Sequence, residues 1–193
     1  MSRPAGDTKM AGGADPAGGP GHMSKSSEEH RHTAAERVGS VSVAVVVVSD
    51  HRTPETDEAG PAIERLVREA GHTVAFRTLV PNSVTEIQHA LDEGLAVADC
   101  VIFSGGTGLG RRDLTVGVVH PRFDVVLPGF GELFRSLSYQ DIGPAAMLSR
   151  AEAGLIQGRL VVLLPGSVQA AGLALTKLIL PELSHLVWEV RRE

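Results

Sequence analysis

The chain has 193 residues, of which 42% are hydrophobic, and it carries a formal net charge of −5 and a single cysteine. This length and composition suit one domain of roughly 150 residues with its own core. The acidic balance disfavours nucleic acid as the main partner. One cysteine excludes an internal disulfide and a thiolate metal cluster.

The first part of the chain, residues 1–39, is rich in Gly, Ala, Ser, Pro and charged residues and has no apolar periodicity. This composition predicts a disordered tail without a signal peptide or membrane anchor. The motif "GGPGHM" before Met23 resembles a cloning remnant, so residues 1–22 need not be native. The longest apolar stretch of the chain, "VAVVVV", is too short to span a membrane. We therefore expect no membrane partner and a cytoplasmic protein, in which Cys100 is a core residue.

The next part of the sequence alternates strand and helix patterns. Residues 42–50 are apolar and β-branched, as in a buried parallel strand, and residues 72–80 predict a second strand ended by Pro81. Ser83 and Glu86 form a capping-box pattern before a helix, and residues 99–106 predict a third strand. The apolar stripes of the two helices between these strands are Ile63, Leu66, Val67 and Ala70, which stop at Gly71, and Val84, Ile87, Leu91 and Leu95.

The remaining pattern completes an α/β fold. A short helical segment starts at about Leu114, the stretch "LPGF" at residues 127–130 predicts a loop, and residues 131–139 predict a helix. Residues 153–166 predict two strands around a Gln157-Gly158 turn, and residues 167–190 predict a helix that breaks or changes direction at Pro181. We expect residues 40–193 to form three α/β/α layers around a twisted, mostly parallel sheet.

Three polar loops follow predicted strands and therefore meet at one edge of the sheet, where such folds bind small ligands. The loops are residues 49–60, 104–113 and 165–167. Glycines in the middle loop, "SGGTGLGRRD", allow close approach to the backbone, whose N–H groups can cradle a phosphate beside Arg111 and Arg112. The spacing matches neither a dinucleotide fingerprint nor a P-loop, which disfavours a dehydrogenase or a kinase. A plain glycine-rich turn is the alternative.

Asp113 ends this loop, and two roles are open for it. Its carboxylate can cap the helical segment "LTVGVV" that follows. It can also hold Mg²⁺, which neutralises phosphate charge during phosphoryl or nucleotidyl transfer. The residues alone do not choose between the two.

Three long motifs together resemble one family. "SGGTGLGRRDLT", "LPGFGELFRSLSYQDIGPAAMLSRAEAG" and "LVVLLPGS" are similar to the molybdopterin-binding domain of the molybdenum cofactor biosynthesis proteins B (MoaB) and MogA, relatives of the gephyrin G domain. The resemblance runs from about Val41 to the C-terminus and is strongest over residues 101–167. It implies a homotrimer that binds molybdopterin, adenylates the pterin phosphate with Mg²⁺ and ATP, releases pyrophosphate, and acts beside other proteins of the pathway.

The resemblance also assigns site residues by position. Asp113 matches a loop aspartate expected to be catalytic and to hold the metal, and Asn82 stands where active members usually carry the aspartate of "VPD". Asp57 and Gly60 fit the family's "D-x-x-G". The positions expected to bind pterin or nucleotide are Ser49, Asp50, Ser104, Gly105, Gly106, Thr107, Gly108, Arg112, Pro128, Gly129, Glu132, Ser149, Arg150, Pro165, Gly166 and Ser167.

Two departures from the family pattern bear on activity. Asn82 keeps an oxygen acceptor but lacks the negative charge, so it holds a divalent ion less well and cannot act as a base. The stretch "RDLTVGVV" also lacks the proline and glutamate of the usual "RDVTPEA". Three functions follow: a molybdopterin adenylyltransferase, a pterin-binding homologue with weak or no activity, and, with least support, a scaffold protein of the gephyrin type.

The C-terminal segment predicts an assembly. Its apolar side chains offer more surface than one sheet face requires, and the resemblance implies a trimer. The residues concerned are Leu178, Ile179, Leu180, Leu183, Leu186 and Trp188.

Overall fold

The computed structural model describes residue 33 and residues 36–192, and most of the predicted tail lies outside this range. Residues 36–38 are helical, and Val38 packs against the hydrophobic core. The described structure thus includes a short helix just before position 40, where the composition changes.

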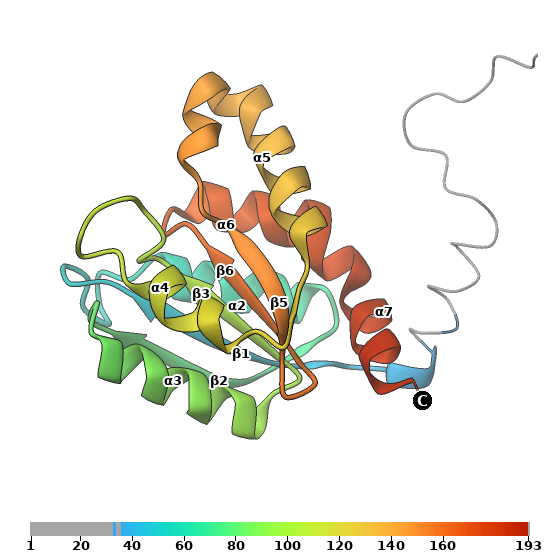
Figure 1. The fold of residues 1–193 in the computed structure, drawn as a ribbon. Coiled ribbons are helices and arrows are strands. Elements are labelled where there is room, and N and C mark those ends of the chain that lie inside the picture. The colour runs from blue at the N-terminus through green and yellow to red at the C-terminus, as the bar shows by residue number, and fades with distance from the viewer. Residues whose placement is uncertain (1–32, 34–35, 193) are drawn as a thin grey trace, which may run out of the picture.

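A six-stranded sheet forms the centre of the molecule (Figure 1). The strands are β1 Ser42–Val48, β2 Thr73–Val80, β3 Cys100–Ser104, β4 Val125–Val126, β5 Glu152–Ile156 and β6 Arg159–Leu164. Their spatial order is β2-β1-β3-β6-β5-β4. β1 pairs in parallel with β2 and β3, β3 pairs in parallel with β6, and β5 runs antiparallel to both of its neighbours. The predicted strands are confirmed, and β4 is an additional edge strand.

Helices connect the strands and cover both faces of the sheet. They are α2 Ala59–Glu69, α3 Val84–Val97, α4 Thr115–Val119, α5 Pro128–Ile142, α6 Val168–Ala174 and α7 Leu180–Arg191. The 3-10 segments η1 His120–Arg122 and η2 Gly143–Leu148 follow α4 and α5, and the π-helical segment η3 Leu175–Ile179 joins α6 to α7. Figure 1 shows that α5 and η2 rise above the body of the molecule.

Apolar side chains of the strands alternate between two cores, because successive residues of a strand point to opposite faces. Val43 and Val45 of β1 pack in one core with α2, α6 and α7, whereas Ala44 and Val46 pack in the other with α3. β1 and β3 are buried on both faces, which explains their unbroken apolar sequences. The predicted three-layer α/β/α architecture is confirmed.

Two local predictions are wrong. The stretch "LPGF" is not a loop, because α5 begins at Pro128, in the first turn of a helix, where the missing proline N–H costs nothing. Ser83 occupies the N-cap position of α3, but its side chain makes no capping hydrogen bond. The Ser83–Glu86 pattern therefore marks the start of the helix without forming a capping box.

The C-terminal helix does not break at Pro181. The chain stays helical over residues 168–191, and Pro181 lies in the first turn of α7, directly after the π-helical segment. Proline cannot bond the carbonyl of the residue four positions earlier, Lys177, and the wider turn of η3 contains that carbonyl. By length and composition this is the one described helix that could cross a membrane, which is weak evidence because one face of it packs in the core.

An ion-pair network lies at the end of the sheet where β3 begins. The carboxylate of Asp99 accepts hydrogen bonds from the Ser42 hydroxyl at 2.8 Å, from Arg159 at 3.2 Å and from Arg191 of α7. Burial alone would raise the pKa of the Asp99 carboxyl, but the bonds from Ser42 and Arg191 and the charge of Arg191 hold it below its ordinary value. The next residue, Cys100, is buried, and burial raises the pKa of its thiol. The prediction that Cys100 is a core residue is confirmed.

The surplus apolar surface lies elsewhere than predicted. Ile179 and Leu183 are buried, and Leu178, Leu180 and Leu186 pack against the same core. The α5–η2 protrusion (residues 128–148) instead carries five exposed large apolar side chains, which are Leu133, Tyr139, Ile142, Met147 and Leu148. Five of the six predicted residues thus belong to or pack against the core of the monomer, and Trp188 packs with His185 and Arg192.

Candidate functional site

A cavity of about 850 Å³, called the main cavity below, lies at the carboxyl ends of β1, β3 and β6. Loops that follow these strands and β2 form its floor, because parallel strands end at the same edge of the sheet. The predicted residues that line it are Ser49, Asp50, Asn82, Ser104, Gly105, Gly106, Thr107, Gly108, Arg112, Asp113, Ser149, Pro165, Gly166 and Ser167. Arg111 does not line it. The loop of residues 104–113 is called the glycine loop below.

The first two glycines of the glycine loop are required by the fold. Gly105 and Gly106 have φ values of +106° and +65°, which residues with side chains rarely adopt. A Cβ atom at Gly105 would also collide with the backbone carbonyl of Val48. The loop is then tied down by Thr115, whose N–H donates to the Gly106 carbonyl at 3.0 Å and whose hydroxyl donates to the Gly105 carbonyl at 2.8 Å.

Backbone donors of the glycine loop remain available to a ligand. Among the described residues, the N–H groups of Gly106, Thr107 and Gly108 have no hydrogen-bond acceptor, and all three residues line the cavity. Successive free N–H groups beside residues of positive φ form a concavity that attracts anions. The loop therefore has the donors that a phosphate group requires.

Asp113 closes the glycine loop on itself. Its Oδ2 accepts a hydrogen bond from the N–H of Gly110 at 2.9 Å, and α4 begins only at Thr115. A Cβ atom at Gly108 would come within 2.7 Å of the same carboxylate. Asp113 thus does not cap α4, and its other oxygen, Oδ1, has no hydrogen-bond partner among the described residues.

Asn82 lies beside the same loop. A Cβ atom at Gly106 would lie 2.5 Å from Asn82 Oδ1, so the amide oxygen packs directly over that glycine. This oxygen is buried and has no hydrogen-bond partner. The carboxylate of Asp50 accepts the backbone N–H of Asn82 at 2.8 Å, which ties the end of β2 to the end of β1. Asp50, Asn82 and Asp113 consequently meet around one loop.

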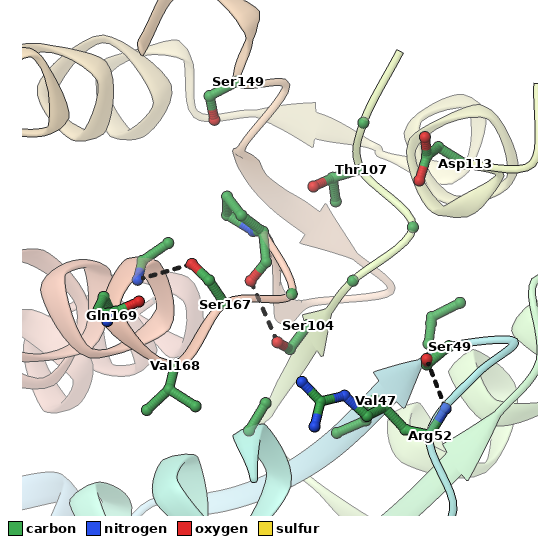
Figure 2. A pocket seen from close by; sticks show the side chains of 18 of the residues that line it. Val47, Ser49, Arg52, Ser104, Thr107, Asp113, Ser149, Ser167, Val168 and Gln169 are labelled. Carbon is green, nitrogen blue, oxygen red and sulfur yellow. Dashed lines mark hydrogen bonds between the residues drawn. The ribbon is translucent and has the colours of Figure 1, made fainter. Parts of the chain in front are cut away.

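The segment after β6 forms the opposite wall of the cavity (Figure 2). Ser167 is the N-cap of α6, and its hydroxyl accepts the N–H of Ala170 at 3.2 Å. The Ser104 hydroxyl donates to the Pro165 carbonyl at 3.3 Å, and a Cβ atom at Gly166 would lie 3.2 Å from the Cα atom of Gly105. The glycine loop and the "PGS" segment therefore support each other.

Several lining residues were not predicted. His51, Arg52 and Gln169 line the cavity, and Figure 2 shows Arg52 close to Ser49, whose hydroxyl accepts the Arg52 N–H at 3.1 Å. His51 and Arg52 follow a strand directly, and Gln169 lies in the first helical turn after "PGS". These positions in the sequence could have predicted them. The mainly apolar wall from α5 and η2 gives no such signal, because apolar residues of this kind are ordinarily expected in a core. Its residues are Phe134, Ser138, Ile142, Ala145 and Leu148.

Four predicted ligand-binding residues do not line this cavity. Pro128, Glu132 and Arg150 line a second cavity of about 440 Å³ on the other side of the glycine loop, and Gly129 lines neither. The guanidinium group of Arg150 bonds three backbone carbonyls of the glycine loop. Arg150 thus contacts the backbone of the glycine loop and lines the second cavity.

The "D-x-x-G" pattern has a structural explanation. Asp57 Oδ1 accepts the N–H groups of Ala59 and Gly60, each at 3.0 Å, and its Oδ2 lies 3.7 Å from Arg77. A Cβ atom at Gly60 would collide with the Asp57 carboxylate. Asp57 thus fixes the start of α2, although it also lines the cavity.

Comparisons with known proteins agree with this geometry. Residues 44–185 match the family model described as "Probable molybdopterin binding domain". The chain is 43% identical over 169 residues to molybdenum cofactor biosynthesis protein B of Bacillus subtilis, a match that covers 86% of this chain and 98% of that protein.

Solved structures lead to the same family. A crystal structure of molybdenum cofactor biosynthesis protein B aligns with a TM-score of 0.78 and 43% identity, covering 81% of this chain and 99% of that one. The tungsten cofactor synthesizing protein MoaB from Pyrococcus furiosus aligns with a TM-score of 0.73 and 36% identity, covering 80% and 99%. These relatives support a role in molybdenum cofactor biosynthesis, and the chain belongs to the molybdopterin-binding domain family.

Proposed function

We propose that this protein binds molybdopterin and transfers an adenylyl group to its terminal phosphate from ATP. The observation that carries the proposal is the row of free N–H groups at Gly106, Thr107 and Gly108, which lines a cavity bordered by Asp50, Asn82 and Asp113. Nucleotidyl transfer brings several phosphate groups together and depends on such donors to stabilise their charge. The cavity volume of about 850 Å³ is within the range of small-molecule sites.

The proposed reaction is a single displacement at phosphorus. A terminal phosphate oxygen of the pterin attacks the α-phosphorus of ATP, and the bond from that phosphorus to the oxygen bridging to the β-phosphate breaks. Pyrophosphate leaves with the bridging oxygen. The glycine loop holds the negative charge that gathers on the phosphate oxygens, while Arg52 and Arg112, which also line the cavity, add positive charge.

Asp113 is the residue that would hold a magnesium ion, with the amide oxygen of Asn82 as a second oxygen beside the glycine loop. Oδ1 of Asp113 is unpaired, and Oδ1 of Asn82 is buried without a partner, so two oxygen ligands face the glycine loop. Mg²⁺ is commonly held by one or two carboxylates together with substrate phosphates, and it supplies charge neutralisation at those phosphates. Among the described residues no group of three or more His, Cys, Asp or Glu side chains is placed to hold a metal ion.

One observation favours a second function. Active members of the family usually place a carboxylate where this chain has Asn82, and the neutral amide there binds a divalent ion less strongly. The alternative is a molybdopterin-binding protein with weak or no adenylyltransferase activity. In either role we expect a cytoplasmic homotrimer that hands its pterin to other proteins of cofactor biosynthesis.

Pyrophosphate release from ATP tests the proposal. We expect release that requires both molybdopterin and Mg²⁺, with one pyrophosphate formed for each adenylylated pterin. Equilibrium dialysis with molybdopterin alone provides the second measurement. Pterin binding without pyrophosphate release would favour the second function, a molybdopterin-binding protein without adenylyltransferase activity. The absence of both binding and release would overturn the proposed function.

A further inference from the structure

The second cavity and its arginines show how the glycine loop acquires its shape. Arg150 stands between η2 and β5 and donates from Nε to the Thr107 carbonyl at 3.1 Å. Its Nη2 donates to the carbonyls of Gly108 and Asp113, the latter at 3.1 Å. Three carbonyls from both halves of the glycine loop therefore converge on one guanidinium group, whose planar fork of donors suits several acceptors at once.

These contacts determine which way the peptide groups face. The carbonyl of Thr107 and the N–H of Gly108 belong to one planar trans peptide, so they point in opposite directions. Because the carbonyl points toward Arg150, the N–H of Gly108 points away from it, and Gly108 lines the main cavity. The same holds for the Gly108 carbonyl and the N–H of Leu109. Arg150 thus takes up three carbonyls of the glycine loop and leaves the N–H of Gly108 free for an anion, while Thr115 bonds the carbonyls of Gly105 and Gly106.

A second arginine holds the backbone on either side of Arg150. Arg135 of α5 donates from Nη1 to the Ala151 carbonyl at 3.3 Å and, at 3.5 Å, to the carbonyl of Ser149. It is half-buried and lines the second cavity together with Arg150. Arg135 of α5 therefore contacts the backbone of residues 149–151, and Arg150 of that segment contacts the glycine loop.

Gly131 makes this arrangement sterically possible. A Cβ atom there would lie 2.8 Å from the Ala151 carbonyl oxygen and 2.9 Å from both terminal nitrogens of Arg135. By contrast, a Cβ atom at Gly129, two residues earlier in the same helix, would have nothing within 4 Å. The second glycine of "PGFGE" is thus explained by the space that the Arg135 guanidinium occupies.

We infer that Gly131, Arg135 and Arg150 are positioning residues that fix the glycine loop in its anion-binding conformation without touching the ligand. The inference rests on the proposed function only in identifying the anion as a phosphate of the substrates. It assigns to "PGFGE" and to Arg150 a role different from direct pterin or nucleotide contact.

The test uses two pairs of variants of the full chain. Gly131→Ala and its control Gly129→Ala both add one methyl group to α5. Arg150→Lys and its control Arg122→Lys both keep the charge and lose the fork; Arg122 pairs with Asp92 at 2.9 Å and does not line the main cavity. Two properties of each purified variant are measured: amide exchange in the ligand-free protein and the dissociation constant for inorganic pyrophosphate by calorimetry.

The amides that report on the loop are those of Gly110, Asp113 and Thr115, which are hydrogen-bonded within it. In Gly131→Ala and Arg150→Lys we expect these amides to exchange at least about tenfold faster, a change of about 1.4 kcal/mol in loop opening, and pyrophosphate to bind about tenfold more weakly. Both controls should match the wild type.

Three other results of these measurements would decide between the inference and its alternatives. Weaker pyrophosphate binding with unchanged exchange would overturn the inference, because it would mean that Arg150 contacts the ligand. Unchanged exchange and unchanged binding would overturn it as well. Faster exchange with unchanged pyrophosphate binding would keep the positioning role and instead count against the phosphate site on which the proposed function depends.

Discussion

The carboxylate of Asp50 accepts the backbone N–H of Asn82 at 2.8 Å, and the side chain of Asn82 lies directly over Gly106. The residue that departs from the family pattern is therefore held in place at the glycine loop, with a neutral amide oxygen over Gly106. This relationship makes Asn82 the most informative position to change.

Asn82→Asp is expected to raise the rate of Mg²⁺-dependent pyrophosphate release, because it adds a charged ligand beside Asp113. The new carboxylate would stand at a buried position without a partner, so we also expect a lower melting temperature without Mg²⁺ and a larger increase on its addition than in the wild type. Thermal melts with and without Mg²⁺ accompany the rate measurement, with Asn82→Ala as the control. An unchanged rate and an unchanged response to Mg²⁺ would contradict a metal role for this position.

Asp113→Asn separates charge from shape. The amide oxygen of asparagine can still accept the N–H of Gly110, so the glycine loop should stay closed. The loss of the negative charge should lower the adenylylation rate by ~100-fold or more, while molybdopterin binding changes only a few-fold, because a metal ligand stabilises the transition state more than the bound substrate. Single-turnover kinetics and pterin binding check the two effects. A rate close to that of the wild type would leave Asp113 only its role in closing the loop.

Asp99 should make the stability depend on pH at acidic values. Its pKa is lowered in the folded protein, so the stability it contributes is present above its ordinary value of about 4 and disappears as the pH falls through the folded value. Asp99→Asn should lower the free energy of unfolding by about 2 kcal/mol at pH 7, as the charge-assisted bonds from Arg159 and Arg191 weaken. Urea unfolding should show a smaller difference in the free energy of unfolding between the wild type and Asp99→Asn at pH 3 than at pH 7.

The control for Asp99 is Asp92→Asn, because Asp92 forms an exposed ion pair with Arg122 on the surface. Exposed pairs of this kind contribute little, so we expect less than about 0.5 kcal/mol at either pH. A difference for Asp99→Asn that persisted at pH 3 would show that packing, and not its charge, accounts for the loss.

Removal of the N-terminal part tests the limits of the domain. The composition of residues 1–38 predicts no packing on the core, but Val38 packs against it. We therefore expect deletion of residues 1–32 to leave the melting temperature and pterin affinity unchanged, whereas deletion of residues 1–38 lowers the melting temperature slightly. Weaker pterin binding after the shorter deletion would mean that this region takes part in the site.

The proposed trimer should use the α5–η2 protrusion and not the C-terminal helix. Tyr139 and Met147 have exposed fractions of 58% and 78%, and apolar side chains exposed to this extent mark association surfaces. The double variant Tyr139→Glu with Met147→Glu should shift the mass found by light scattering from trimer to monomer at micromolar concentration. Val97→Glu, a change at a similarly exposed apolar residue of α3, should leave the mass unchanged. A monomeric wild type would contradict the proposal.

Sequence patterns predicted the parts of this fold that depend on local periodicity. The runs of β1 and β3 are apolar throughout because both faces are buried, and Gly158, which adopts a positive φ, marks the turn between β5 and β6. The meeting of Asp50, Asn82 and Asp113 followed from topology, since loops after parallel strands share one edge.

The parts that escaped prediction depend on contacts between distant residues. The bonds from Arg150 to backbone carbonyls of the glycine loop depend on where the segment before β5 lies in the fold, which no spacing reveals. In the same way, the apolar stripe containing Leu178 and Leu186 did not disclose that the core of the monomer already covers it. Helical periodicity shows that a face is apolar but does not identify what packs against it.

The π-helical segment η3 restricts how many residues the C-terminal helix can contain while its apolar face stays on the core. Besides Ala174, the buried residues of this helix lie at positions 171, 175, 179, 183 and 187 and so recur every four residues. An α-helix repeats every ~3.6 residues, so the stripe would rotate by roughly 40° at each step. The wider turn at 175–179 absorbs part of that rotation. Deleting one residue there would turn Leu183 and Val187 by roughly 100° away from the core. Exchanges at the exposed Thr176 or Lys177 should accordingly be tolerated during divergence of the sequence, while insertions and deletions in this segment should be rare.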